Sequence, residues 1–125
     1  MSKYILSFSG GKDSTYLLLE LIRRKYPLDE AVFFDTGWEF PVMYEHIEKC
    51  KKICEDNGIK FVTLHPERSF DYLMFDYKYK GRDGTNKVGF SWCGGNGHCR
   101  WGTGEKIRTV DKYFKKMRAM FLMSA

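Results

Sequence analysis

Residues 7–15 read SFSGGKDST, which places two glycines, a lysine and an acid among four hydroxyl side chains. Glycine lets a backbone approach a ligand closely, and lysine and hydroxyl groups donate hydrogen bonds to phosphate oxygens. The stretch therefore predicts an anion site. An acid in the middle of such a site requires a cation nearby. The expected binding residues are Ser7, Ser9, Gly10, Gly11, Lys12, Asp13, Ser14 and Thr15, of which Lys12 and Asp13 are the catalytic candidates.

The elements around this stretch must place it at the end of a strand. Apolar runs predict strands at 4–8, 31–34 and 60–64, and helices from Ser14 or Thr15 to about Tyr26 and from Pro41 to about Asn57. Pro41 suits the first turn of a helix and Gly58 its end. Alternating strands and helices joined by short loops predict right-handed βαβ units, a parallel sheet and an α/β fold. The loop then lies where the first strand ends and the first helix begins, at a helix N-terminus that favours anions.

The remainder of the chain gives weaker patterns. We expect a short helix at 69–75, a long loop at 77–92 and a helix from Thr103 to about Arg118. The last residues, AMFLMSA, are expected to form a fourth strand. At 125 residues, the chain is interpreted as one domain.

The residues S-G-G-K-D-S resemble the pyrophosphate loop of the PP-loop ATP pyrophosphatases, the adenine nucleotide alpha hydrolase-like superfamily. The resemblance implies a Rossmann-like doubly wound parallel sheet with three layers, α/β/α. It also implies that the loop grips the phosphates of ATP or a related adenine nucleotide. Mg²⁺ and the loop cations would then offset the charge of Asp13.

A second stretch, FFDTGWEFPVMYEHI at 33–47, resembles a motif of phosphoadenosine phosphosulfate (PAPS) reductases, which act in sulfur metabolism. The matching residues are Asp35, Thr36, Gly37, Phe40, Pro41 and Tyr44. The resemblance implies that the backbone near Phe34 contacts adenine and that Asp35, Thr36 and Gly37 bind the nucleotide. Asp35 and Glu39 would hold Mg²⁺ or a ribose hydroxyl. The alternative for Asp35 is a turn-forming side chain.

A third stretch, GFSWCGGNGHCRWGTGEK at 89–106, resembles reductase-like members of this group, and Arg100 would face the anionic end of the nucleotide. The Glu-Cys-Gly-x-His segment that carries the reductases' nucleophile has no match, and the family's C-terminal segment is expected to be missing. Cys93 or Cys99 could replace that nucleophile, and Cys99, which has His98 and Arg100 beside it in sequence, is the catalytic candidate. We expect an enzyme that cleaves ATP at the α–β phosphate bond or acts on a sulfonucleotide. The alternative is a non-catalytic nucleotide- or nucleic-acid-binding domain, the remnant of a longer enzyme.

The four cysteines fall into two pairs. Cys50 and Cys54 share a helical stripe with Met43 and Ile47, which indicates a core face. The five residues between Cys93 and Cys99 exceed the spacing of structural zinc sites. A zinc or iron–sulfur site there lacks support, and a redox pair or loop thiols remain open.

The chain carries 21 Lys and Arg against 16 Asp and Glu, a net charge of +5 that suits an anionic partner. The segment 100–118 is rich in basic residues, which we interpret as a solvated helix face; a track for RNA or DNA phosphates is the alternative. No stretch suggests a membrane span or a signal peptide, so we expect a cytoplasmic protein. Self-association into a homo-oligomer through the apolar C-terminal residues is a further expectation.

Overall fold

The computed structural model describes residues 3–90 and 99–124, and the side chains of 100–101 and 119–124 are outside this description. The chain forms two compact units. The first unit comprises Met1–Asp35 and Glu39–Leu64, and the second comprises Thr36–Trp38 and His65–Ala125. The expectation of one nucleotide-binding domain over residues 1–125 stays a prediction.

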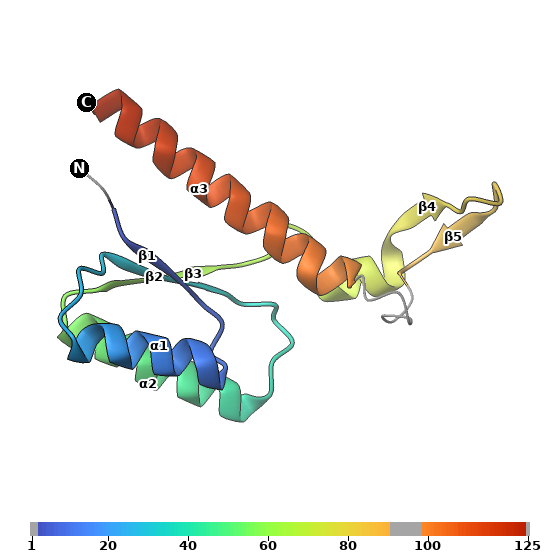
Figure 1. Cartoon of the computed structure of the whole chain (residues 1–125). Coiled ribbons are helices and arrows are strands. Elements are labelled where there is room, and N and C mark those ends of the chain that lie inside the picture. The colour runs from blue at the N-terminus through green and yellow to red at the C-terminus, as the bar shows by residue number, and fades with distance from the viewer. Residues whose placement is uncertain (1–2, 91–98, 125) are drawn as a thin grey trace. The chain divides into compact units, whose positions relative to one another are not determined.

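The first unit is built on a parallel sheet of three strands in the order β1-β2-β3 (Figure 1). The strands are β1 (Ile5–Phe8), β2 (Glu30–Phe34) and β3 (Lys60–Leu64). All five residues of β2 are buried, and the apolar run of its last four, AVFF, predicts this for a central parallel strand. The first, Glu30, is buried as the partner of Lys3 in an ion pair. In the register, Phe8 lies opposite Phe33, so β1 and β2 end at the same edge of the sheet.

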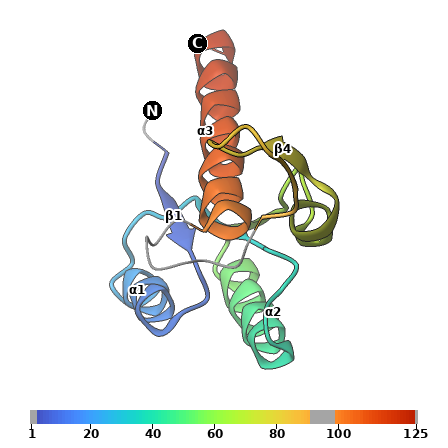
Figure 2. The same cartoon turned by 90° about the vertical axis from the view of Figure 1, so that its right-hand side faces the viewer.

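Two helices, α1 (Lys12–Arg23) and α2 (Pro41–Asp56), connect the strands and cover one face of this sheet (Figures 1 and 2). Successive right-handed crossovers in one direction across a sheet place their helices on the same face. The predicted α/β class and βαβ order are therefore confirmed. The predicted start of α1 is wrong. The residue that precedes the helix is Gly11, three residues before Ser14, and its extended backbone leads directly into the first turn. No side chain of the described residues caps this end of the helix.

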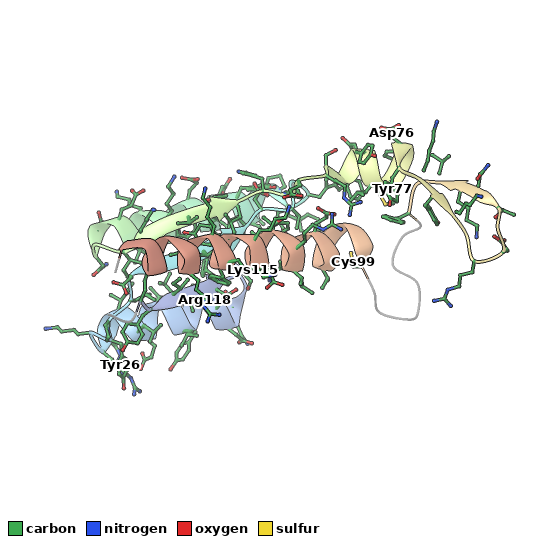
Figure 3. The ribbon with its side chains drawn as sticks, turned by 90° about the horizontal axis from the view of Figure 1, so that it is seen from above. Tyr26, Asp76, Tyr77, Cys99, Lys115 and Arg118 are labelled. Carbon is green, nitrogen blue, oxygen red and sulfur yellow. The ribbon has the colours of Figure 1, made fainter. Side chains whose placement is uncertain are left out.

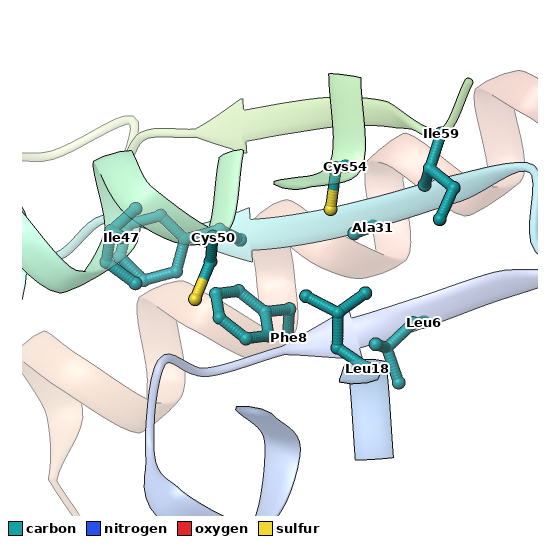
Figure 4. Packing of buried hydrophobic residues seen from close by; sticks show 9 residues of the cluster. Leu6, Phe8, Leu18, Ala31, Ile47, Cys50, Cys54 and Ile59 are labelled. Atoms are coloured by element: carbon teal, nitrogen blue, oxygen red, sulfur yellow. The ribbon is translucent and has the colours of Figure 1, made fainter. Parts of the chain in front are cut away.

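The core of the first unit lies between the sheet and these helices (Figure 4). Its buried members are Leu6, Phe8, Leu18, Ala31, Phe33, Ile47, Cys50, Cys54 and Ile59. Phe8 contacts Phe33 and Phe61 edge-on, with ring centroids 6.4 and 5.9 Å apart. The interpretation of Cys50 and Cys54 as core residues is confirmed, since both are at most 2% exposed.

The second unit contains a hairpin of β4 (Lys78–Lys80) and β5 (Asn86–Val88) and the long helix α3 (Glu105–Ser124). Single π-helical turns lie at η1 (Tyr72–Asp76) and η2 (Arg100–Gly104); Tyr77 follows η1 and Cys99 precedes η2 (Figure 3). The predicted short helix at 69–75 is thus replaced mainly by η1, and the predicted loop by the hairpin. The predicted C-terminal strand is also wrong, because α3 continues through it.

Local chemistry explains why the hairpin forms and why α3 extends to Ser124. In the hairpin turn, Asp83 Oδ1 accepts from the backbone amide and hydroxyl of Thr85, at 3.1 and 2.7 Å, and Gly84 adopts a φ of +80°. Such a side-chain-braced turn favours chain reversal. In the segment AMFLM, alanine, leucine and methionine are strong helix formers and no residue is β-branched, so α3 continues through it.

A buried ion pair joins two segments of the second unit that lie 37 residues apart in sequence. Arg68 donates from Nε and Nη2 to Glu105 Oε1, at 2.9 and 2.6 Å, and the Glu105 side chain is 1% exposed. The same guanidinium lies 5.3 Å from the ring centroid of Tyr77. Lys112 on α3 also pairs with Glu67, on the surface. These contacts tie the start of α3 to the segment that precedes η1.

Candidate functional site

The turn from Ser9 to Gly11 links β1 to α1, and the packing of Gly10 fixes its shape. Gly10 has a φ of +81°, a backbone conformation that residues other than glycine adopt only with strain. A Cβ added there would lie 2.4 Å from Ile47 Cδ1 on α2. The loop backbone therefore rests directly on α2, at a distance that only glycine permits.

Two serines close a hydrogen-bond ring inside this loop. Ser14 Oγ donates to the carbonyl of Gly11 at 3.2 Å and lies 3.0 Å from Ser9 Oγ. The amides of Gly11 and Ser9 donate in turn to Ser9 Oγ and Ser14 Oγ, each at 3.3 Å. Because Ser14 gives its proton to Gly11, the 3.0 Å contact is made by the proton of Ser9. The serines thus hold the loop in one conformation before any ligand arrives.

The backbone amides of the first turn of α1 follow this loop and are available to hydrogen-bond a ligand. An α-helix leaves its first N–H groups without helical partners. Within the described part of the chain, no acceptor is found for the amides of Lys12, Asp13 and Ser14, whereas Thr15 donates to the carbonyl of Gly11 at 3.0 Å. The side chains of Lys12 and Asp13 are exposed. Three outward amides and a lysine at a helix N-terminus make an arrangement suited to anions.

A histidine that the sequence left unassigned joins the two helices beside this loop. His46 Nε2 on α2 lies 2.8 Å from Thr15 Oγ1 on α1, and 3.6 Å from Cys50 Sγ. Burial raises the pKa of Cys50, so its thiol stays protonated at neutral pH. The sequence signal was present but weak: His46 precedes Cys50 by one helical turn, beside the core stripe rather than on it.

A second acid-centred arrangement lies at the same edge of the sheet, after β2. The amide of Asp35 donates to the carbonyl of Leu64 at 2.8 Å, and Asp35 Oδ1 accepts from the hydroxyl of Tyr44 at 2.8 Å. The amide of Glu39 donates to the same hydroxyl at 3.4 Å. Burial, followed by the hydrogen bond to Asp35, raises the pKa of Tyr44, so the phenol remains a donor at neutral pH.

The other predicted site residues have varied positions. Ser7 is exposed on β1, and Phe34 is buried at the end of β2. Thr36 and Gly37 belong to the second unit, where Thr36 Oγ1 accepts from the amide of Trp38 at 3.1 Å. The assignment of these four residues to nucleotide binding stays a prediction.

The cysteine-rich stretch is described only in part. Cys99 Sγ accepts from the amide of Gly102 at 3.3 Å. Cys93 and the side chain of Arg100 lie outside the described residues. Among the residues that are described, no group of three or more His, Cys, Asp or Glu side chains is placed to hold a metal ion. A zinc or iron–sulfur site through Cys93 and Cys99, which lacked support from the cysteine spacing, involves a residue outside this description.

The parallel sheet, with a serine- and glycine-built loop and a helix N-terminus at its carboxyl edge, defines a Rossmann-like α/β fold. The chain belongs to the phosphoadenosine phosphosulfate reductase domain family, whose model matches residues 3–123. This places it in the PP-loop superfamily, whose members bind adenine nucleotides. The recognition made from the sequence motifs is confirmed.

Curated relatives extend this placement. The chain is 34% identical over 65 residues to a tRNA(Ile)-lysidine synthase of Chlamydia trachomatis, a match that covers 52% of this chain and 20% of the relative. The corresponding enzyme of Hydrogenovibrio crunogenus is 35% identical over 63 residues, covering 50% and 15%. An uncharacterised protein of Methanocaldococcus jannaschii is 29% identical over 89 residues, covering 71% and 16%.

The chain thus spans a fifth or less of the length of these relatives. No solved structure matches it. Across the described residues, no helix has the length and apolar character needed to cross a bilayer.

Proposed function

We propose that the first unit binds the phosphates of ATP at the loop of residues 9–14, and that the protein cleaves ATP at the α–β phosphate bond. The observation that carries this proposal is the set of three outward amides at Lys12, Asp13 and Ser14, above a loop already held by its own serines. A preformed set of donors spends no binding energy on reorganisation. Lys12 adds a positive charge at the same place.

Mg²⁺ fits the acids of this unit. Proteins bind Mg²⁺ through one or two carboxylates together with the phosphates of the substrate. Asp35 and Glu39 are the residues that would hold it, and an ionised carboxylate can accept further contacts beside the one that Tyr44 makes to Asp35 Oδ1. The ion would supply charge neutralisation for the phosphates and for Asp13.

In the proposed reaction, an acceptor nucleophile attacks the α-phosphorus of ATP. The bond from that phosphorus to the bridging oxygen breaks, pyrophosphate leaves, and the nucleophile loses its proton to solvent. The amides and Lys12 would stabilise the charge that grows on pyrophosphate. The acceptor becomes adenylylated and so activated for a later step.

Action on a sulfonucleotide is the second candidate. Cys99 would attack the sulfate sulfur, and the adenosine nucleotide would leave. The amide of Gly102, which donates to Cys99 Sγ at 3.3 Å, supports this candidate because such a donor favours the thiolate. A binding domain without catalysis is the third candidate.

A nucleic-acid partner is supported by the distribution of charge. The second unit carries twelve Lys and Arg against six Asp and Glu, whereas the first carries nine against ten. Lys115 and Arg118 lie on α3 (Figure 3) and are exposed. A chain in which one unit is strongly basic and the other nearly neutral is typical of proteins that contact nucleic-acid phosphates. The relative named as a tRNA(Ile)-lysidine synthase agrees with an RNA partner. Homo-oligomer formation stays a prediction.

Calorimetric titration with ATP, AMP, PAPS and its unphosphorylated analogue, each with Mg²⁺, tests the proposal. ATP is expected to bind most tightly, and incubation with ATP should release pyrophosphate once the acceptor is supplied. Preference for PAPS, with sulfite release in the presence of reduced thioredoxin that is lost in Cys99→Ser, would favour the second candidate. Failure of all four ligands to bind would overturn nucleotide binding itself.

A further inference from the structure

We infer that His46 is a positioning residue for the phosphate loop, holding the first turn of α1 in place through the hydroxyl of Thr15. This inference rests on the proposed binding of ATP at residues 9–14. It assigns a function to a histidine that the family motifs do not include among their matching residues, and it changes the role expected of Thr15.

The main chain of Thr15 is not available to a ligand. Its amide already donates to the carbonyl of Gly11 at 3.0 Å, while its hydroxyl lies 2.8 Å from His46 Nε2. Thr15 is therefore oriented toward α2, and its hydroxyl is committed to the opposite helix. The turn that Thr15 closes carries the three outward amides, so a contact made by Thr15 sets the direction in which those amides point.

Two adjacent residues of α2 support the loop at two points. Ile47 lies under Gly10, so close that an added Cβ would be 2.4 Å from its Cδ1. His46, the residue before it, contacts Thr15 at the other end of the loop. The apolar contact limits how near the loop can approach α2, and the hydrogen bond prevents the turn from moving away. Together they fix the position of the amides between Gly10 and Thr15.

The surroundings of His46 favour one stable arrangement. Thr15 and His46 are half-buried, and Cys50 below them is buried. Cys50 Sγ lies 3.6 Å from His46 Nε2 and keeps its proton, because burial raises its pKa. Loss of the imidazole would remove the contact of the Thr15 hydroxyl at 2.8 Å and leave it the Cys50 thiol as a weaker hydrogen-bonding neighbour. Small displacements of positioned donors can cost large factors in binding and catalysis.

A double-mutant cycle on ATP binding tests the inference. His46→Leu keeps an apolar side chain of similar bulk and is expected to weaken ATP binding about five- to tenfold, as loss of one hydrogen bond does. His46→Gln places an amide near the position of Nε2 and should restore affinity to within about twofold. Thr15→Val should match His46→Leu, and the double variant should be no weaker than either single variant. Glu48→Ala, an exposed change on α2, should leave affinity unchanged.

A ligand-free measurement separates this inference from the proposed function. The ¹⁵N chemical shift of His46 Nε2 should change on Thr15→Val in the absence of nucleotide. If the wild type does not bind ATP, the proposed function fails, and this shift still reports whether the contact exists. Equal ATP affinity of His46→Leu and wild type, equal damage by His46→Gln and His46→Leu, or additive effects in the double variant would each overturn the positioning role.

Discussion

Tyr44 donates its hydroxyl hydrogen bond to Asp35 Oδ1 over 2.8 Å, across nine residues of sequence. A side chain from the first turn of α2 thereby holds the acid that follows β2. The phenol is half-buried and its pKa is raised, chiefly by burial, so it remains a donor throughout the neutral range. Side chains of α2 therefore contact both Asp35 and the phosphate loop, and they hold both in position.

Removal of this hydroxyl tests whether Asp35 serves a metal. Tyr44→Phe keeps the ring and removes the hydrogen bond from the hydroxyl to the Asp35 carboxylate. We expect the Mg²⁺ concentration that gives half-maximal ATP binding to rise about threefold to tenfold, because a hydrogen bond to a charged group contributes roughly 1.5–3 kcal/mol and part of that is recovered from water. Nucleotide titrations at graded Mg²⁺ measure it.

Tyr26→Phe is the matched control, because Tyr26 is exposed in the turn after α1. It should leave the Mg²⁺ requirement unchanged. An unchanged requirement in Tyr44→Phe as well would show that Asp35 does not depend on Tyr44 for any metal contact.

The close contact of Gly10 with α2 predicts a large loss of stability on substitution. Gly10→Ala combines a left-handed backbone at φ +81° with a Cβ 2.4 Å from Ile47 Cδ1. Backbone strain of about 1–2 kcal/mol and overpacking of about 1–3 kcal/mol should both reduce the free energy of unfolding. Urea denaturation measures the sum.

Gly58→Ala separates these two causes. Gly58 has a φ of +71° but nothing within 4 Å of an added Cβ. It should therefore lose only the backbone part, roughly 1–2 kcal/mol. Equal losses at Gly10 and Gly58 would mean that the loop does not press against Ile47.

The buried ion pair of the second unit should be far stronger than the exposed one. Glu105→Gln leaves the Arg68 guanidinium without its carboxylate in a site where the Glu105 side chain is 1% exposed. Because Arg68 keeps 27% exposure and the glutamine oxygen can still accept from it, we expect a loss of about 1.5–3 kcal/mol, the contribution of hydrogen bonds to a charged group. Glu67→Gln removes a surface pair with Lys112 and should leave the free energy of unfolding nearly unchanged, because solvent screens exposed charges. Similar losses in the two variants, by thermal unfolding, would contradict the importance of the buried pair.

The raised pKa of the buried Cys54 thiol predicts that the free energy of unfolding decreases at alkaline pH. Burial is the largest cause that raises its pKa, from 9.0 to about 11, so the folded protein holds a proton that the unfolded chain releases first. The corresponding stability is complete below pH 9 and decreases as the pH rises through 11, by roughly 3 kcal/mol in all for two pKa units at about 1.36 kcal/mol each. Urea denaturation at several pH values measures it: between pH 9 and above 11, the free energy of unfolding of the wild type should decrease by this amount more than that of Cys54→Ala. Parallel pH profiles for the two proteins would rule it out.

The parts predicted well from the sequence are those that depend on local pattern. The strand at 60–64 has the predicted bounds, and the stripe of Ile47, Cys50 and Cys54 identifies the buried face of α2. Glycines and prolines mark the connections between these elements. Each such signal acts within one or two turns of chain, which is the range that a single sequence reports.

The parts that were missed depend on contacts distant in sequence. His46 meets Thr15 across 31 residues, and Arg68 meets Glu105 across 37. The periodicity of the sequence does not indicate such pairs, since only the tertiary fold brings them together. Thr15 itself was expected to contact the ligand, and its orientation toward α2 could be recognised only when both helices were placed on the same face of the sheet.

The most direct test of the account is ATP binding by Lys12→Ala, measured by calorimetry with Mg²⁺. Lys12 is exposed in the first turn of α1, beside the outward amides, and its removal should weaken ATP binding about tenfold or more, since a charge-assisted hydrogen bond contributes roughly 1.5–3 kcal/mol. Lys52→Ala removes an exposed lysine of α2 and should retain wild-type affinity. Equal affinity for ATP in Lys12→Ala, Lys52→Ala and wild type would contradict a phosphate site at this loop.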